Sequence, residues 1–377
     1  MSGSMKALRF HGQKDLRVDA VPVPELQAGQ VKVKPEWCGI CGSDLHEYIA
    51  GPIIIPTPEK PHHLTGCGYP VIMGHEFAGE IVELGPGVEP GRLKVGMKVC
   101  IEPTLFDDAC PPCLDNRRNL CDKGGFFGLS GWGGGFSEYV CLKEKVIHPL
   151  PENVPTHIGG TNNHGKSIAA LVEPLSVAWH AVKASDHSPD YSSLIIGAGP
   201  IGLAVLLCLL AKGSRRILIS EVSPQRIKHA LDIASAHPDV EIVVLDPTQV
   251  DVVAKAKELC TEGIQGPNVV YDCAGVQKSI DTAIAAVRKG GLVCNVAVWE
   301  KPASINLNTL VFGEKKIFGV ATFREGDFPE VIEAIAGGKI RNPEKLITAK
   351  VALDDAVKDG FDALLKSRDH VKILVHP

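Results

Sequence analysis

The sequence has no long uninterrupted apolar run. Its longest apolar stretch, residues 194–211, is broken by three glycines and a proline, and a membrane-spanning helix needs about 20 consecutive apolar residues. The opening letters MSGSMKALRF also lack the apolar core of a signal peptide. We therefore expect no membrane span and no secretory leader, and we expect the protein to be cytoplasmic.

An excess of positive charge is also missing. The chain has 39 Lys and Arg residues against 44 Asp and Glu, a formal net charge of −5 and a pI near 6.3. Such a balance produces no field that would draw nucleic acid or an anionic membrane. We expect neither as a partner, and the chain shows no internal repeat or low-complexity tract.

Length and composition indicate two packed domains. The 377 residues exceed a usual single domain, and 45% hydrophobic residues suffice for packed cores. Twelve cysteines are many for a cytoplasmic protein, where disulfides are rare, which leaves metal binding, catalysis or simple burial. Four of them lie in apolar surroundings and are expected to pack in the core, namely Cys208, Cys260, Cys273 and Cys294.

The stretch WCGICGSDLH at residues 37–46 carries three groups useful for alcohol chemistry. A Cys41 thiolate can hold Zn²⁺, a Ser43 hydroxyl can contact an alcohol at the metal, and His46 can reach toward solvent. Together they outline a path for a proton. A buried structural cysteine, or a redox pair of Cys38 and Cys41, accounts for the same sequence. Candidate metal ligands elsewhere in the chain must decide between these interpretations.

Two further sets of ligand candidates lie later in the chain. His75 and Glu76 are adjacent within GHEFAGEIVELGPGV at residues 74–88, so a turn permitted by the glycines must present both. Glu173 stands before Pro174, which breaks the preceding segment and could leave the carboxylate facing a cleft. An acidic residue before proline is also ordinary at a helix N-terminus.

A second cluster of thiols lies in the polar loop DDACPPCLDNRRNLC at residues 107–121. Cys110, Cys113 and Cys121 are spaced by two and seven residues. Three cysteines so placed in a polar loop predict a structural zinc site. Cys100 is one possible fourth thiolate, at an unusual spacing.

The first hundred residues predict a β domain. Short alternating segments separated by Gly and Pro run through residues 5–101 and are typical of a compact barrel-like fold. The irregular stretch at residues 49–70 lies between two ligand-bearing turns and is the kind of loop that shapes a substrate pocket. A polar segment at residues 156–167 is expected to be a surface excursion.

Residues 191–321 alternate strands and helices, the rhythm of a parallel doubly wound α/β sheet. The motif GAGPIG follows the first strand, and Glu221 ends the second at the distance typical of a dinucleotide site. A carboxylate there accepts hydrogen bonds from a ribose diol and repels a 2′-phosphate, which favours NAD over NADP. Arg226 argues against this preference, because a guanidinium could bind a 2′-phosphate. We expect Arg226 instead beside the adenine or on the helix surface.

Each residue of this motif has an expected part in cofactor binding. Gly197 permits the tight turn, Gly199 lets the backbone approach the pyrophosphate, and Gly202 lets helix and strand pack closely. Pro200 and Ile201 complete the motif as cofactor-binding candidates.

Taken together, these motifs resemble the zinc-containing medium-chain alcohol and polyol dehydrogenases. GICGSDLH, the pattern at residues 74–88 and EPLSV at residues 173–177 occur in the order typical of that family, and the resemblance covers the chain from Met5. Within the family the chain looks most similar to the 2,3-butanediol dehydrogenases, through residues 37–48, 172–183 and 295–299.

The resemblance implies a fold and an activity. The expected fold is a doubly wound Rossmann sheet with NAD bound to residues 177–321, plus a GroES-like β-barrel catalytic domain formed by residues 1–176 and 322–377. The expected reaction is hydride transfer between a secondary alcohol or vicinal diol and NAD, with 2,3-butanediol and acetoin as the pair and zinc as Lewis acid. A homodimer or homotetramer through sheet edges of the nucleotide domain is implied as well.

The resemblance also implies roles for single residues. Cys41, His75 and Glu173 are expected to bind the catalytic zinc, and Glu76 either binds it or sits just behind it. Ser43 and His46 are expected to carry the alcohol proton to water.

The second zinc site departs from the pattern of the family, whose structural zinc uses four cysteines. The first of these positions is Asp107 here. A carboxylate can ligate zinc, so the site is either Cys₃Asp or weakened.

Two other activities stay open at this point. One is an NAD-dependent polyol dehydrogenase acting on xylitol, sorbitol or L-arabinitol. The other is a zinc-free quinone or enoyl reductase on the same plan, which is expected to lack the set of Cys41, His75 and Glu173.

Overall fold

A computed structural model describes residues 3–154, 167–260, 263–367 and 369–377. The surface excursion expected at residues 156–167 lies outside the described residues except for Ser167. The chain divides into two compact units. The first comprises Met1–Glu173, Arg324–Ala336 and Ile347–Pro377, and the second comprises Pro174–Phe323 and Gly337–Leu346.

The first unit is built on β-sheets, as the short alternating segments predict. Its main sheet has seven strands in the order β10-β6-β5-β3-β18-β17, with β9 pairing with β3. These strands are β3 (Gln30–Gly39), β5 (Glu76–Leu84), β6 (Lys98–Ile101), β9 (Val140–Lys143), β10 (Ile147–Pro149), β17 (Ile347–Ala352) and β18 (Lys372–His376). Smaller sheets pair β1 (Ser4–Gly12) with β2 (Asp15–Pro22) and β4 (Val71–Ile72), and β7 (Thr104–Leu105) with β8 (Gly125–Phe126).

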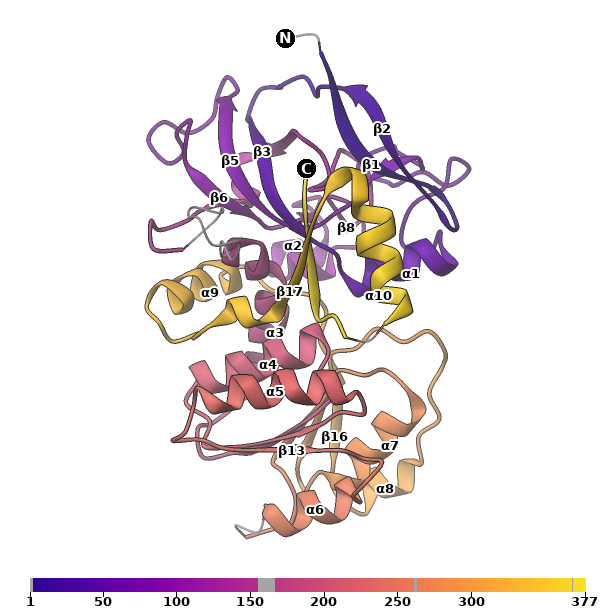
Figure 1. The fold of residues 1–377 in the computed structure, drawn as a ribbon, viewed down its shortest axis with the longest axis vertical. Coiled ribbons are helices and arrows are strands. Elements are labelled where there is room, and N and C mark those ends of the chain that lie inside the picture. The colour runs from indigo at the N-terminus through magenta and orange to yellow at the C-terminus, as the bar shows by residue number, and fades with distance from the viewer. Residues whose placement is uncertain (1–2, 155–166, 261–262, 368) are drawn as a thin grey trace. The chain divides into compact units, whose positions relative to one another are not determined.

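Alternation along β3 explains the core of this unit. Val31 and Val33 are fully buried, whereas Lys32 is half-buried and Lys34 is exposed, because successive strand residues face opposite sides of a sheet. The C-terminal strand β18 pairs with the end of β3, opposing Val375 to Cys38; Figure 1 shows this yellow strand beside the indigo one. The last residues of the chain therefore lie next to the stretch that carries Cys41.

The α-helices described in the first unit are short. They are α1 (Gly42–Ala50), α2 (Pro111–Leu114), α9 (Asp327–Ala336) and α10 (Asp362–Lys366). The helix α3 (Val172–Ala184) starts at the boundary of the units and runs unbroken through Pro174. The helix break predicted at Pro174 is therefore wrong, because a proline in the first turn removes no intrahelical hydrogen bond.

The second unit holds a six-stranded parallel sheet in the order β13-β12-β11-β14-β15-β16, which confirms the doubly wound α/β prediction. Its strands are β11 (Ser192–Ile196), β12 (Arg216–Ser220), β13 (Glu241–Leu245), β14 (Val269–Asp272), β15 (Leu292–Asn295) and β16 (Lys316–Gly319). Its helices are α4 (Pro200–Ala211), α5 (Pro224–Ser235), α6 (Val252–Leu259), α7 (Gln277–Ala286) and α8 (Leu307–Val311). Figure 1 shows α4 and α5 on one face of this sheet and α6 and α7 on the other.

One strand is shorter than its sequence predicts. The apolar letters suggest a strand over residues 292–298, but β15 ends at Asn295. The amides of Val296 and Ala297 both donate to the carbonyl of Asp272, so the chain bends toward β14 instead of continuing along β16. In the part of the chain that the structure describes, no helix combines the length and apolarity needed to span a bilayer.

Candidate metal centres and nucleotide site

Helix α1 positions three of the predicted site residues. Cys41 is its N-cap, and the Cys41 amide donates to the Asp44 carboxylate at 2.9 Å, an acid-capped start that satisfies an otherwise free helix donor. Ser43 and His46 are three residues apart and therefore share one face of the helix. The cap thus sets the Cys41 thiol at the helix entrance, with the hydroxyl and the imidazole on successive turns.

The turn before β5 brings His75 and Glu76 to this thiol. Gly74 has φ +94°, and a Cβ there would lie 2.7 Å from the Cys38 sulfur, so only glycine fits the turn. The ligand atoms of Cys41, His75 and Glu76 all lie within 4.8 Å of one another. The three residues come together from two segments, as a shared metal would require.

The alternative redox pair does not fit this environment. Cys38 is fully buried, and both it and Cys41 are free thiols. Burial holds the pKa of Cys38 well above its ordinary value. Cys38 belongs to the apolar core of the first unit and lies outside both groups of candidate metal ligands, so Cys38 is a packing residue.

The Asp44 carboxylate faces the imidazole of His75. Its Oδ1 lies 3.5 Å from the His75 Nδ1, and both side chains are buried. Burial lowers the pKa of His75, but the charges of Asp44 and Cys41 outweigh it and raise this pKa well above the ordinary value. With Nδ1 facing the carboxylate, Nε2 is directed to the metal group, 3.3 Å from the Ser43 Oγ.

Lys372 holds Glu76 from behind. Its Nζ lies 2.7 Å from both carboxylate oxygens of Glu76 and donates to the Ile40 carbonyl at 3.1 Å. Burial opposes the charge of Lys372, yet Glu76 raises its pKa above the ordinary value. Because both oxygens are engaged by the ammonium, this geometry favours Glu76 behind a metal over Glu76 as a full ligand.

Glu173 lies near this group without being part of its closest atoms. Its side chain is buried, and the pKa of Glu173 is raised to about 8: burial is the main cause and the charge of Glu76 adds to it, against the lowering effect of His75 and Lys372. A buried acid with too little positive charge around it is what a divalent cation would satisfy. Thiolate, imidazole and carboxylate are ligand types that zinc accepts, so these residues fit a zinc ion.

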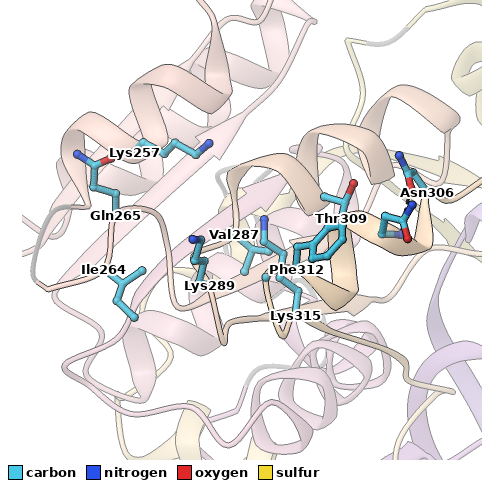
Figure 2. Close-up of a pocket in the computed structure, with 11 residues that line it drawn as sticks. Lys257, Ile264, Gln265, Val287, Lys289, Asn306, Thr309, Phe312 and Lys315 are labelled. Atoms are coloured by element: carbon cyan, nitrogen blue, oxygen red, sulfur yellow. Dashed lines mark hydrogen bonds between the residues drawn. The ribbon is translucent and has the colours of Figure 1, made fainter.

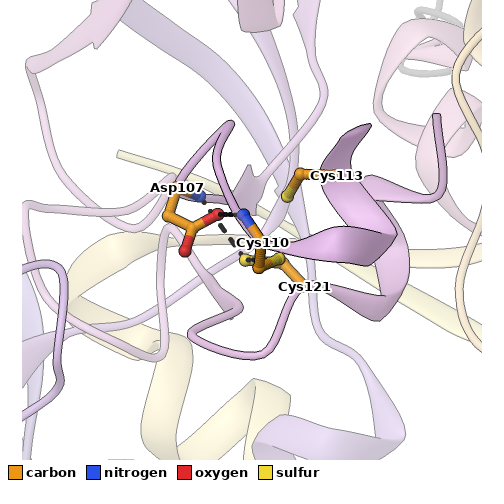
Figure 3. Close-up of side chains that lie close together, drawn as sticks. All are labelled: Asp107, Cys110, Cys113 and Cys121. Atoms are coloured by element: carbon orange, nitrogen blue, oxygen red, sulfur yellow. Dashed lines mark hydrogen bonds between the residues drawn. The ribbon is translucent and has the colours of Figure 1, made fainter. Parts of the chain in front are cut away.

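The structure also gathers Asp107, Cys110, Cys113 and Cys121 (Figure 3), with ligand atoms within 4.8 Å of one another. The Cys110 and Cys121 sulfurs are 3.7 Å apart and all three thiols are free. Burial raises the pKa of Cys113 to about 12, a penalty that a cation among the thiols would remove. Cys100 is not in this group: it is buried in β6.

Asp107 has the protonation state that a ligand needs. Its Oδ1 accepts hydrogen bonds from the amides of Ala109 and Cys110, at 2.9 and 3.0 Å. These bonds hold the pKa of Asp107 well below its ordinary value. The ionised carboxylate and three thiols fit a Cys₃Asp zinc site.

We expect Asp107→Ala to lower the zinc content from about two to about one per chain. The loop would keep three thiols and lose its carboxylate, so its zinc should wash out in mild chelator. Asp107→Cys should retain both zinc ions. Elemental analysis after dialysis measures this, with Asp115→Ala, an exposed acid of the same loop paired with Arg117, as control. Two zinc ions retained in Asp107→Ala would contradict the Cys₃Asp assignment.

The glycine-rich turn has the geometry of a phosphate cradle. Gly197 has φ +95°, and a Cβ on Gly202 would collide with the Gly197 carbonyl. The Glu221 carboxylate accepts the amides of Ala198, Val222 and Ser223 at 2.7 to 2.8 Å. Glu221, directly after β12, therefore braces the turn, and the turn fits a pyrophosphate at the N-terminus of α4.

The remaining predicted cofactor residues surround that helix start. Pro200 and Ile201 open α4, where proline is well tolerated. The Arg226 guanidinium lies 3.5 Å from the point that a Cβ of Gly199 would occupy. The structure therefore places Arg226 over the glycine-rich turn.

A pocket of about 700 Å³ in the second unit lies elsewhere (Figure 2). Lys257, Lys289 and Lys315 contribute to its lining, on segments that lead toward the N-terminal ends of β14, β15 and β16. Ligands of doubly wound sheets bind outside the C-terminal strand ends. This pocket is therefore not the nucleotide site.

Sequence reasoning missed Asp44 and Lys372. Asp44 had a local signal, an acid three residues after Cys41 at a helix start. Lys372 had only a faint one, a lysine beside the apolar run of a buried strand, because its partner Glu76 is 296 residues away.

Comparison with known proteins agrees with this geometry. Residues 27–152 match the family "Alcohol dehydrogenase GroES-like domain" and residues 200–337 match "Zinc-binding dehydrogenase". The chain is 40% identical over 374 residues to (R,R)-butanediol dehydrogenase of Bacillus subtilis, covering 99% of this chain and 100% of the relative. It is 37% identical to the Neisseria gonorrhoeae protein of the same name, covering 99% of each.

Solved structures give the same result. The crystal structure of 2R,3R-butanediol dehydrogenase from Bacillus subtilis superposes with a TM-score of 0.87 over 99% of each chain. The expected combination of a GroES-like domain with a Rossmann sheet is thereby confirmed. The chain belongs to the zinc-containing medium-chain alcohol and polyol dehydrogenases.

Proposed function

We propose that this chain oxidises 2,3-butanediol to acetoin with NAD⁺ and catalyses the reverse reduction. The observation that carries this proposal is the grouping of Cys41, His75 and Glu76 within 4.8 Å, in a chain whose full-length relatives are named butanediol dehydrogenases. We assign the chemistry to the first unit and the binding of the dinucleotide to the second.

In this proposal, Cys41, His75 and Glu173 hold the catalytic zinc and Lys372 keeps Glu76 in place behind it. Zinc, when bound, supplies a Lewis acid that lowers the pKa of an alcohol hydroxyl, and NAD⁺ supplies the hydride acceptor. Ser43, 3.3 Å from His75 Nε2, takes the alcohol proton. His46, one turn further along the same face of α1, passes that proton to water.

We propose NAD as the preferred cofactor because Glu221 is a buried acid directly after β12. We expect Glu221→Gln to lower the preference for NAD⁺ over NADP⁺, measured as the ratio of kcat/KM values, by about tenfold. The uncharged amide no longer repels a 2′-phosphate. Glu241→Gln, at the start of β13 and in an exposed pair with Arg216, is the control and should keep the wild-type ratio. An unchanged ratio in Glu221→Gln would refute the assignment.

Initial rates decide the substrate. The panel comprises the 2,3-butanediol isomers, acetoin, xylitol, sorbitol and L-arabinitol, each with NAD and NADP. We expect the highest kcat/KM for a butanediol isomer with NAD⁺. A higher value for any of the sugar alcohols would replace the proposal with a polyol dehydrogenase.

We also propose a homo-oligomer, dimer or tetramer, formed through the edge of the nucleotide sheet. In the described part of the chain, β16 ends the sheet order, and the nearby Val311 and Phe312 are 66% and 80% exposed. An open strand edge beside exposed apolar side chains is suited to pairing with another copy. Light scattering of purified protein tests this, and a monomer at micromolar concentration contradicts it.

We propose the cytoplasm as its location. All twelve cysteines are free, a state that a reducing compartment preserves. Fractionation of the native cell checks this, and recovery from a secreted fraction overturns it.

A further inference from the structure

The pocket of Figure 2, which we call the lysine pocket, has no part in the reaction proposed above. Its volume is about 700 Å³, within the range of pockets that hold small organic ligands. All of its described lining residues belong to the second unit. The pocket is therefore large enough for a whole metabolite, and one unit alone builds it.

Three segments contribute one lysine each to this pocket. Lys257 is in the last turn of α6, Lys289 lies between α7 and β15, and Lys315 directly precedes β16. Figure 2 shows Lys257 toward one end of the pocket and Asn306 at the other. Among the lining residues that the structure describes, none is acidic. Three positive side chains thus share a pocket to which those residues add no negative one.

Lys315 is directed toward α7. Its Nζ donates to the Ile284 carbonyl at 2.6 Å, in the last turn of that helix, where carbonyls have no intrahelical partner. This bond uses one of the three N–H donors of the ammonium. The pKa of Lys315 is lowered, mainly by burial and also by the charges of Lys257 and Lys289. The three ammonium groups are therefore close enough to repel one another.

The helix ends beside the lysines offset only part of this charge. Lys257 stands at the C-terminal end of α6, and Lys315 bonds to the C-terminal end of α7. Each helix C-terminus is equivalent to about half a negative charge. Two such ends supply about one negative charge against three positive ones. An excess of about two positive charges remains, which an anionic ligand would neutralise.

We propose that the lysine pocket binds a phosphorylated small organic molecule, at a site separate from the glycine-rich turn, and that it binds bisphosphates more tightly than monophosphates. A phosphate monoester carries about −1.5 to −2 charges near neutral pH and accepts charge-assisted hydrogen bonds from ammonium groups. Gln265 and Thr309 also line the pocket and can hydrogen-bond to hydroxyl groups of the ligand. The inference does not depend on the proposed alcohol chemistry.

Calorimetric titration of the full chain, saturated with NADH, tests the proposal. NADH occupies the glycine-rich turn, so phosphates added afterwards must bind elsewhere. The probes are myo-inositol, inositol 1-phosphate and inositol 1,4-bisphosphate, none of which has a carbonyl for NADH to reduce. We expect the bisphosphate to bind with a dissociation constant of about 100 μM or tighter, the monophosphate about tenfold more weakly, and inositol not at all.

Variants tie this binding to the lysines. Lys257→Gln/Lys289→Gln should weaken the binding of the bisphosphate about a hundredfold, because each lysine contributes about tenfold through a charged contact. Lys255→Gln is the matched control, because Lys255 lies in the same helix, does not line the pocket and pairs with Glu258; it should keep the wild-type affinity.

Lys289→Gln alone changes an exposed side chain and decides the matter, with an expected tenfold loss, if the double variant does not fold. A wild-type chain that does not bind the bisphosphate overturns the inference. An unchanged affinity in the lysine variants overturns it as well, and so does an equal loss in Lys255→Gln, which would indicate a general effect of charge.

Discussion

Cys41→Ser is expected to abolish turnover while leaving NAD⁺ binding intact. The thiolate is the softest donor of the group formed with His75 and Glu76, and a serine hydroxyl does not replace it as a zinc ligand. Loss of a metal that contributes several kcal/mol to the transition state corresponds to a drop of about 10³-fold or more in kcat. The nucleotide turn belongs to the other unit and should bind NAD⁺ as before.

Three measurements check this expectation. Steady-state rates give the loss of kcat, elemental analysis should show about one zinc fewer per chain, and fluorescence titration should give an unchanged NAD⁺ dissociation constant. Cys67→Ser is the matched control, because Cys67 is a partly exposed thiol of the same unit outside both metal groups. Retained turnover in Cys41→Ser would remove Cys41 from the ligand set.

Lys372→Met is expected to destabilise the first unit strongly. The side chains of Lys372 and Glu76 are 3% and 1% exposed and lie 2.7 Å apart. Removing the ammonium therefore leaves the Glu76 carboxylate buried without an opposite charge. Breaking a buried pair on one side costs about 3 to 5 kcal/mol. A loss of this size lowers the melting temperature by about 10 °C.

Calorimetry of chelated protein measures this effect without a contribution from metal binding. The double variant Glu76→Gln/Lys372→Met should recover much of the loss, because no lone charge remains. Lys6→Met is the control: it breaks the exposed Lys6–Asp354 pair and should shift the melting temperature little. A Lys372→Met protein with the same melting temperature as the wild type would show that the buried pair does not stabilise the unit.

The nucleotide half of the fold was accessible from local sequence. Each strand from β11 to β16 is a short apolar run, and the glycine motif directly joins β11 to α4. Local signals failed where contacts from elsewhere prevailed. The Asp272 carbonyl accepts hydrogen bonds from the amides of Val296 and Ala297, which would otherwise have extended β15. Pro174 lies in the first turn of α3 and does not interrupt that helix.

The metal groups show the same division. Asp107, Cys110, Cys113 and Cys121 lie within one loop, so their spacing alone predicts that they meet. Cys41 and His75 could each be predicted as a ligand because each lies in a recognisable motif. Neither motif indicates how close the two side chains come in the folded chain.

The sequence by itself determined the residue types that chemistry needs and the local turns that carry them, because caps, glycine turns and strand periodicity depend on neighbours in the chain. Only the tertiary structure decided what surrounds those residues. It placed Asp44 beside His75, paired Lys372 with Glu76 across 296 residues, and brought the backbone amides of residues 53–55 onto the Glu47 carboxylate. Burial and charge at such contacts depend on segments that the local pattern does not connect.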